Sequence, residues 1–387
     1  MIGRKLKRVW NAKDEKIWLL ALDWAKAFDS ITPASLLSAL KRFGLPSHVV
    51  EIIHAIYSTR KFYVNECDVD SNVHSQESGI SQGCPLSPYL FVILMTILLE
   101  DAREDLRQTY GIALPEDAVN ELLYADDTLL IAAHGSTVEK YLQCIVDVGR
   151  ENGLLMNWRK VELLTVNCEG VITQPDGKTI QSKPSFIYLG SLIAADGNVS
   201  SELARRLGAA QGEFKQLNQV WRHSRLSVPE RTRVYMACVV SRLLYGLQAT
   251  WPNKTARSKL DAFHARSLRT ILGITPSYYS RISNQEVLRR AGSVSLSQLL
   301  LEQQLNFFGK LARRPPLCPV RQLVFNNGLA QAPRQYERRR GRPKLEWANE
   351  IFRIVSEMFP SQDIFSECML NATSWREAIR KHCRRQA

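Results

Sequence analysis

Three carboxylates in the first half of the chain have types and spacing suited to chemistry on phosphates. Asp23 follows the short apolar run 17–22, and the pair Asp126-Asp127 interrupts the apolar segment 122–133. Adjacent acids repel each other, and a divalent cation relieves that repulsion. If two strands place Asp23 beside Asp126, their oxygens suit Mg²⁺, and two such ions roughly 3.5–4 Å apart can clamp the oxygens of a phosphoryl transfer. The alternative for a lone carboxylate at a strand end is a turn residue or a helix cap.

The elements that must position these acids follow from hydrophobic periodicity. The run 17–22 predicts a buried strand, and 122–133 predicts a hairpin with the two acids at its tip. Helices are expected over 33–43, 47–58 and 138–151, and a further helix from residue 89 follows a loop at 79–88. Beyond residue 200, apolar residues recur every three or four positions, which predicts helices over 203–221, 229–247 and 256–272. This order indicates an α+β domain followed by an α-helical one.

The charge of the chain divides at the same place. Residues 1–199 hold 19 basic and 25 acidic side chains, a net of −6, whereas residues 200–387 hold 32 and 13, a net of +19. A basic half of this size predicts a polyanionic partner, most simply nucleic acid. An anionic membrane surface is the alternative, but no basic amphipathic helix stands out to support it.

Other compositional features exclude several classes. The eight cysteines form no CxxC pair, which argues against a zinc ribbon and a secreted disulfide framework. No signal peptide is expected, because the first 16 residues are basic and polar. The longest apolar run, 89–99, is about half the roughly 20 residues that a membrane span needs.

Five motifs in order give the chain a family resemblance. Residues 22–29, LDWAKAFD, resemble the first palm motif of reverse transcriptases from non-LTR (LINE-type) retrotransposons, and residues 79–88, GISQGCPLSP, resemble the second. Residues 124–127, YADD, match the polymerase signature. The chain also resembles the fourth motif, at Gly153-Leu154 with Asn157, Lys160 and Glu162. It resembles the fifth motif, the primer grip, at Tyr188-Leu189-Gly190. The resemblance continues through 245–274 and 341–347.

The resemblance implies a fold and a domain plan. Residues 1–198 would form a right-hand polymerase palm, an antiparallel sheet with helices. A helical thumb or connection would occupy 199–330, and a basic linker with a helical C-terminal tail would occupy 331–387. The family carries a fingers subdomain before the first motif, and many members an endonuclease region further upstream. The sequence is therefore expected to be an N-terminally truncated element copy or a partial gene model.

The resemblance also implies an activity. It is RNA-directed DNA polymerisation, with transfer of dNMP to a primer 3′-hydroxyl by two Mg²⁺ ions, Mn²⁺ being the alternative metal. Asp23, Asp126 and Asp127 would be the catalytic and metal-binding residues, Asp127 in a supporting role. The implied partners are an RNA template, a DNA primer or target and dNTPs, with action in the nucleus and no membrane; the oligomeric state stays open.

The remaining site residues follow from the same motifs. An aromatic ring at Phe28 would exclude a 2′-hydroxyl, and Asp29 is expected to cap the helix that begins near Pro33. The resemblance implies that the nucleotide is contacted by Gln82, Gly83 and Lys160. It implies that the primer is contacted by Tyr188, Leu189 and Gly190. Contacts with the nucleic-acid backbone are expected from Arg205, Arg206, Arg340 and Arg342. Two alternatives remain: a catalytically dead remnant that only binds nucleic acid, and a reverse transcriptase of the intron-maturase type.

Overall fold

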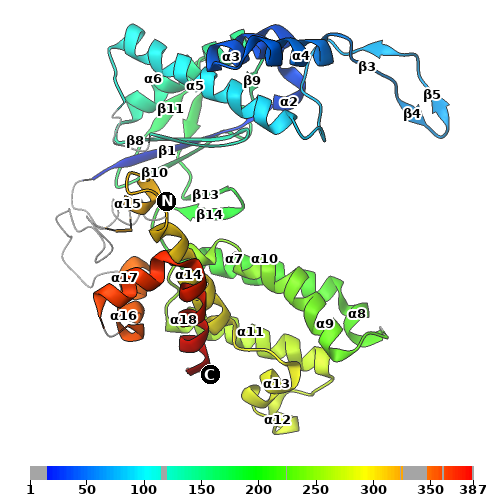
Figure 1. The fold of residues 1–387 in the computed structure, drawn as a ribbon, viewed down its shortest axis with the longest axis vertical. Helices are drawn as coiled ribbons and strands as arrows, with labels where there is room; N and C mark the ends of the chain where they lie inside the picture. Colours follow the sequence, from blue (N-terminus) through cyan, green and yellow to red (C-terminus); the bar gives the residue numbers. More distant parts are fainter. Residues whose placement is uncertain are drawn as a thin grey trace. The chain divides into compact units, whose positions relative to one another are not determined.

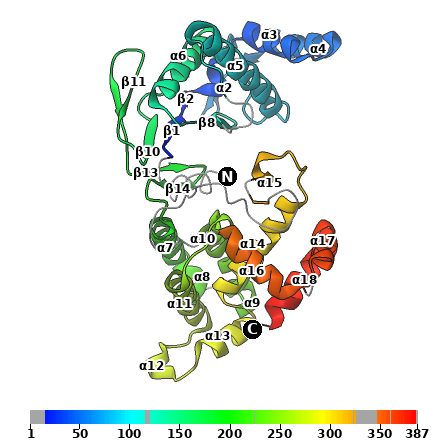
Figure 2. The same ribbon diagram turned by 90° about the vertical axis from the view of Figure 1, so that its left-hand side faces the viewer.

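A computed structural model describes residues 15–114, 120–223, 225–322, 324–325, 347–359 and 361–385. The chain divides into two compact units, and the boundary falls between Leu189 and Gly190. Figures 1 and 2 show the mixed sheet-and-helix unit that ends at Leu189 and the helical unit that follows it. The boundary therefore lies within the fifth motif, whereas the domain prediction placed it at residue 198.

The first unit is built on a four-stranded antiparallel sheet in the order β10-β1-β8-β7. Strand β1 (Ile17–Leu22) pairs with both β8 (Asp127–Ala132) and β10 (Glu162–Val166), and β7 (Glu121–Tyr124) pairs with β8. Because β1 is central, five of its six residues are buried, which explains its continuous apolar run. The predicted strand and hairpin are confirmed.

Helices cover one face of this sheet (Figures 1 and 2). They are α3 (Pro33–Phe43), α4 (Ser47–Ser58), α5 (Ser87–Tyr110) and α6 (Gly135–Glu151). Buried leucines of α3 and α5 and the apolar stripe of α6 join Trp18 and Leu20 of β1 in one hydrophobic core. The unit is thus the α+β fold that the sequence predicts.

Short strand pairs complete the first unit. Strand β2 (Trp24–Ala25) pairs with β9 (Leu155–Met156), and β11 (Val171–Thr173) pairs with β12 (Thr179–Gln181). Strand β13 (Ser185–Tyr188) lies at the end of the unit. The β2–β9 pair joins the first motif directly to the fourth.

A hairpin arm, residues 61–75, extends from the helices of the first unit (Figure 1). Two strand pairs form it, β3 (Lys61–Phe62) with β6 (His74–Ser75) and β4 (Asn65–Glu66) with β5 (Val69–Asp70). All eight of these strand residues are exposed. The sequence analysis did not predict this arm.

The second unit begins with strand β14 (Ser191–Ala194) and is otherwise helical in its described residues. Its first hydrophobic core surrounds Trp221, Tyr235 and Leu260. The helices that contribute to it are α7 (Val199–Gln216), α8 (Asn218–His223), α9 (Val228–Tyr235), α10 (Ser241–Leu244), α11 (Lys254–Leu272) and α13 (Asn284–Ala291). The helix predicted over 229–247 is interrupted by a π-helical segment, Met236–Val240, and ends before Gly246.

A second core in this unit surrounds Phe308 and Trp375. It is formed by α14 (Leu296–Ala312), α16 (Trp347–Met358), α17 (Gln362–Leu370) and α18 (Ala372–Arg385). Helix α14 serves both cores, with Leu300 in the first and Leu305 in the second. Two short helices, α12 (Ser277–Ser280) and α15 (Pro319–Gln322), lie between longer ones. The described residues near the C-terminus are thus mostly helical, in α16, α17 and α18.

None of the helices in the described ranges combines the length and the apolar character that crossing a bilayer requires. The basic segment with Arg340 and Arg342 lies outside the described residues.

Candidate active site

Asp23 lies directly after β1, beside the hairpin that carries the other two acids. The register pairs Leu22 with Thr128, so its continuation by one residue sets Asp23 opposite Asp127. The fourth motif approaches Asp23 as well. Asn157 Nδ2 donates to Asp23 Oδ2 at 2.9 Å, and Lys160 Nζ lies 3.3 Å from Oδ1 and 3.2 Å from Oδ2. Three motifs distant in sequence therefore meet at one carboxylate.

The hairpin turn consists of only two residues. Tyr124 pairs with Asp127, which leaves Ala125 and Asp126 as the loop. Ala125 adopts a φ of +54°, a left-handed conformation that the tightest hairpin turns need but that is costly without glycine. Asp126 is thus at the tip, whereas Asp127 is the first residue of β8 rather than a second tip residue.

The charges of this site act on one another. Partial burial and then the negative charges of Asp126 and Asp23 raise the pKa of Asp127, while Lys160 opposes them. The ionised form of Asp127 is therefore disfavoured, because burial and the negative charges nearby both oppose it. A bound divalent cation would reverse this balance.

The three acids carry the type of oxygen ligand that Mg²⁺ prefers, but their side chains are not arranged to share an ion. Hard carboxylate oxygens are the ligands that this ion prefers. Within the described ranges, no group of three or more His, Cys, Asp or Glu side chains is placed to hold a metal. Asp23 faces Asn157 and Lys160 instead. Sharing an ion therefore requires the carboxylates to turn toward one another.

The first and second motifs are joined by main-chain hydrogen bonds. The N–H of Gly79 donates to the carbonyl of Ile31 at 2.8 Å, and that of Ile80 donates to Phe28 at 2.6 Å. Gly79 has a φ of +92°, and a Cβ there would lie 3.0 Å from the Cα of Asp29. Only glycine allows this close approach.

Phe28 lies on a short helix, α2 (Ala27–Ser30), and is half-buried. Its ring stacks on that of Phe91 in α5, with the centroids 4.5 Å apart and the planes 13° apart. The residue expected to exclude a 2′-hydroxyl is therefore held in a fixed orientation from one side. That support comes from a helix that the motif alone could not identify.

Gln82 and Gly83 are exposed on the loop of the second motif, as contact with a nucleotide requires. Gln82 Nε2 donates to Asp29 Oδ1 at 3.3 Å. The prediction that Asp29 caps the next helix is wrong. Thr32, directly before Pro33, occupies the N-cap of α3 and accepts from the N–H of Ser35, because Asp29 lies within α2.

Tyr188 of the fifth motif has a position that the sequence did not predict. Its side chain is buried, and its hydroxyl lies 3.1 Å from the carbonyl of Leu122 and 3.4 Å from that of Asp127. Burial and the charge of Asp127 raise the pKa of Tyr188 to about 12, so the hydroxyl stays a donor. Tyr188 therefore holds both strands of the acidic hairpin. Leu189 is partly exposed.

A second tyrosine, on helix α6, contacts the first strand of the same hairpin. Tyr141 of α6 donates to Glu121 Oε2 at 2.6 Å, and Glu121 also pairs with Arg103. Burial raises the pKa of Tyr141 to about 12. Neither contact could be found from spacing, because each partner lies far away in the sequence.

Two of the four arginines expected to contact the nucleic-acid backbone, Arg205 and Arg206, are engaged within the second unit. Arg206 is buried; its guanidinium donates to Glu202 Oε1 at 2.6 Å, to the carbonyl of Gly190 at 2.6 Å and to that of Arg242 at 2.9 Å. Arg205 also bonds Glu202 and Gly190. Burial alone would raise the pKa of Glu202, but the two arginines hold it low. A structural role therefore replaces the predicted phosphate contact for Arg206.

Comparison with known proteins agrees with this site. The family model described as "Reverse transcriptase (RNA-dependent DNA polymerase)" matches residues 3–193, which include Asp23, Asp126 and Asp127. Residues 3–193 therefore resemble the reverse transcriptase family.

Similar curated proteins come from retrotransposable elements. The Pol polyprotein of the R2 retrotransposable element from Popillia japonica is 26% identical over 262 residues, and that of R2DM from Drosophila melanogaster is 29% identical over 174. The RNA-directed DNA polymerase of the mobile element jockey from Drosophila funebris is 24% identical over 269 residues. The matched part of this chain therefore resembles proteins encoded by retrotransposable elements of these kinds.

The matched regions are partial. They cover 63%, 45% and 65% of this chain in these three cases, and 34%, 16% and 28% of the relatives. The chain thus spans about a third or less of their lengths. Among solved structures, a match to telomerase from Candida tropicalis covers 51% of this chain and 37% of the telomerase chain, with a TM-score of 0.38 and 14% identity.

Proposed function

We propose that this chain is an RNA-directed DNA polymerase that extends a primer 3′-hydroxyl with dNMP from a dNTP. The observation that carries the proposal is the meeting of Asp23, the Asp126-Asp127 hairpin and Lys160 at one end of the central sheet. Three carboxylates and one lysine, contributed by three motifs, suit a phosphoryl transfer, in which negative charge shifts from one oxygen to another.

Asp23 and Asp126 would hold the divalent ions, with Asp127 in support. When bound, two Mg²⁺ ions supply a lowered pKa for the primer hydroxyl and charge neutralisation for the triphosphate; Mn²⁺ has the same ligand preference. The protein's own part is to hold these acids in position for the ions. Tyr188 does so through the carbonyls at the hairpin.

The other side chains would handle the nucleotide. Lys160, now beside Asp23, can swing to the triphosphate as a counter-charge or proton donor. Phe28, fixed by Phe91, would exclude a 2′-hydroxyl and so select dNTPs. Gln82 and Gly83 would touch the incoming nucleotide and the template, and Leu189 with Gly190 would contact the primer. If the primer is chromosomal DNA, extending it with RNA as the template would require the protein to act in the nucleus.

Primer extension on poly(rA)/oligo(dT) with Mg²⁺ tests the proposal. Asp23→Asn and Asp126→Asn should each reduce incorporation to background. Asp176→Asn is the matched control, because it removes the same charge from an exposed turn where Asp176 pairs with Lys178, and it should retain wild-type incorporation. If the wild-type chain binds template–primer but extends it no better than Asp126→Asn, the activity proposal fails and the binding-only alternative takes its place.

A further inference from the structure

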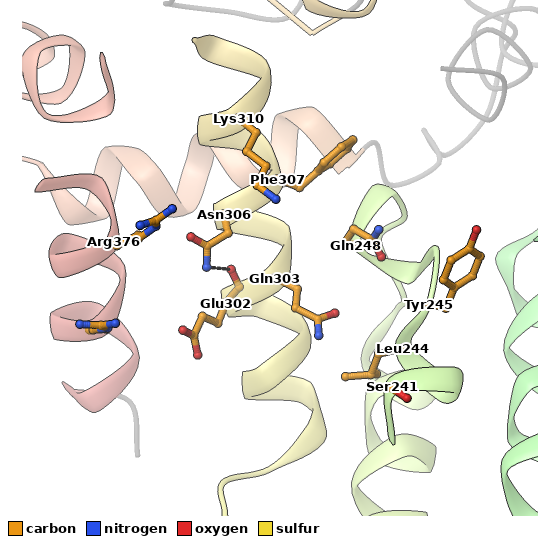
Figure 3. Close-up of a pocket in the computed structure, with 11 residues that line it drawn as sticks. Ser241, Leu244, Tyr245, Gln248, Glu302, Gln303, Asn306, Phe307, Lys310 and Arg376 are labelled. Carbon is orange, nitrogen blue, oxygen red and sulfur yellow. Dashed lines mark hydrogen bonds between the residues drawn. The ribbon is translucent and has the colours of Figure 1, made fainter. Parts of the chain in front are cut away.

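A groove in the helical unit is lined by residues of that unit alone. Its volume is about 590 Å³, within the range of 300–1,000 Å³ typical of ligand sites. Figure 3 shows α14 as its floor, with Glu302, Gln303, Asn306 and Lys310 along one helix face. Helix α18 borders it on one side and the α10 region on the other.

The groove is lined by cations without acidic partners. Arg376 and Arg380 project from successive turns of α18, and Lys310 lies on α14. Among residues that the structure describes, none of these three side chains takes part in an ion pair within 4 Å. By contrast, the exposed Arg289 and Arg290 of α13 both pair with Glu286.

The unpaired cations create a local repulsion. Burial and the nearby charge of Arg376 lower the pKa of Arg313, and Glu302 is the only acid among the lining residues. A chain of phosphates would relieve this repulsion by direct pairing and by release of its own counterions. The charge pattern therefore selects a polyanion rather than a neutral ligand.

The same groove also presents side-chain amides. Gln303 and Asn306 lie on the floor, and Gln248 faces them from the opposite side (Figure 3). The amide nitrogen of Asn306 donates to the carbonyl of Glu302 at 2.9 Å, which leaves its oxygen as an acceptor. Amides offer both donors and acceptors, which match base edges that are accessible in single strands but paired in a duplex.

We propose that this groove binds a single-stranded segment of nucleic acid. Arg376, Arg380 and Lys310 contact its phosphates, and Gln248, Gln303 and Asn306 contact the edges of one or two bases. The inference rests on the proposed function in one respect, that nucleic acid is the substrate of the chain. It assigns a second contact, outside the carboxylate site, to the unpaired part of a template or target strand.

Fluorescence anisotropy with the full chain tests the groove, using a labelled 15-nucleotide RNA, the DNA of the same sequence and the corresponding DNA duplex. For Arg376→Gln/Arg380→Gln, the Kd for the bound single strand should rise about tenfold or more, and the salt slope should fall by about 1.4 for two lost phosphate contacts. The duplex should lose less affinity. The matched control is Arg289→Gln/Arg290→Gln, which removes the same charge from paired arginines and should change the Kd by less than about twofold.

A second variant separates base contacts from charge. Gln248→Ala/Gln303→Ala should weaken single-strand binding while leaving the salt slope unchanged, because no phosphate contact is lost. A preference for RNA or for DNA then identifies the strand. Circular dichroism melting of each variant checks that the fold is retained.

The groove proposal is overturned if both arginine pairs weaken binding equally, if duplex and single strand lose affinity equally, or if no variant changes the Kd. Failure of the polymerase proposal looks different: the wild-type chain would not extend a primer, yet single strands would still bind in a way that depends on Arg376 and Arg380. Extension without any groove effect would sink the groove alone.

Discussion

At the scale of single residues, the position of Lys160 is the most informative. Its ammonium lies 3.2 Å from Asp23, where a metal ion would need the same oxygens. If Asp23 binds a divalent cation as proposed, Lys160 would compete with that cation, and the lysine would become available for the triphosphate only after the cation displaces it.

Lys160→Ala should therefore change two quantities in opposite directions. The Mg²⁺ concentration for half-maximal extension should fall, because the competing cation is gone. The maximal rate should fall by about 10²-fold, the usual effect of losing a proton donor. Metal titration of primer extension measures both. Lys178→Ala, which frees an exposed acid outside the site, should change neither; a higher Mg²⁺ requirement in Lys160→Ala would contradict the competition.

Asp127 supports a prediction about stability. Its pKa is raised, so the folded protein holds this proton more tightly than the unfolded chain. The contribution of Asp127 to the free energy of unfolding is therefore greatest below the ordinary aspartate pKa, and it declines as pH rises through the raised pKa. At neutral pH, where Asp127 is ionised, this contribution is lost completely. Asp127→Asn should therefore stabilise the metal-free protein at pH 7.5 by about 1 kcal/mol.

Thermal melting in EDTA measures this difference. Mg²⁺ should raise the Tm of the wild type more than that of Asp127→Asn, because the ion relieves the same repulsion. An equal or lower Tm for the variant in EDTA would show that the charge at Asp127 is already compensated.

At the scale of elements, the acidic hairpin depends on its supports. A two-residue turn with a left-handed alanine is held by Tyr188 at two main-chain carbonyls. We expect Tyr188→Phe, which removes only the hydroxyl, to lower kcat about tenfold with little change in the KM for dNTP, since a misaligned acid slows chemistry more than it weakens binding.

Tyr141→Phe is the control for that experiment. It removes a buried hydroxyl bonded to Glu121, on the same hairpin but not at the carbonyl of Asp127. Both variants should lose a similar amount of stability, about 1–2 kcal/mol, so a loss of kcat confined to Tyr188→Phe would separate positioning from folding. Equal kinetics in the two variants would argue against a positioning role.

Local patterns predicted the elements that carry the chemistry. The strand before Asp23 and the helices 33–43 and 47–58 occur at the predicted residues, because periodicity and caps act over a few neighbours. The contacts of Tyr188 and Arg206 were not predicted, since they depend on which distant segments meet. The interruption of the predicted 229–247 helix needs tertiary packing as well. Motif order therefore predicted which acids come close together, but not which contacts hold the acidic hairpin.

At the scale of the whole molecule, the basic half of the sequence acquires a finer meaning. The net of +19 over residues 200–387 is spread over many arginines that pair internally, such as those with Glu202, Glu213 and Glu286. The groove of α14 and α18 gathers cations that are not used in this way. The charge count predicted a polyanionic partner, and the distribution of ion pairs is the basis for proposing where that partner binds.

The helical unit also contains a buried histidine that makes its stability depend on pH. His264 is fully buried; its Nδ1 lies 3.0 Å from the Tyr235 hydroxyl, and its Nε2 lies 3.1 Å from the carbonyl of Val294. Burial lowers the pKa of His264 to about 4. The unfolded chain binds the proton first, so stability is lost as pH falls from the ordinary value of about 6.5 toward 4, by about 3 kcal/mol in total.

Urea unfolding followed by tryptophan fluorescence between pH 7.5 and 4.5 measures this loss. His264→Gln should be less stable at pH 7.5 but should show a shallower decline, whereas His54→Gln, at an exposed position of α4, should keep the wild-type pH dependence. An unchanged decline in His264→Gln would assign the acid sensitivity to other groups.

The hairpin arm at 61–75 has a practical consequence for handling the protein. Its strands are edges on both sides, and Phe62, Val64 and Val69 are exposed along it. Unpaired edges with apolar side chains readily add strands from other copies. Concentrated stocks would therefore begin to aggregate through this arm while both units remain folded, and Val69→Lys would delay the onset of turbidity without touching any motif.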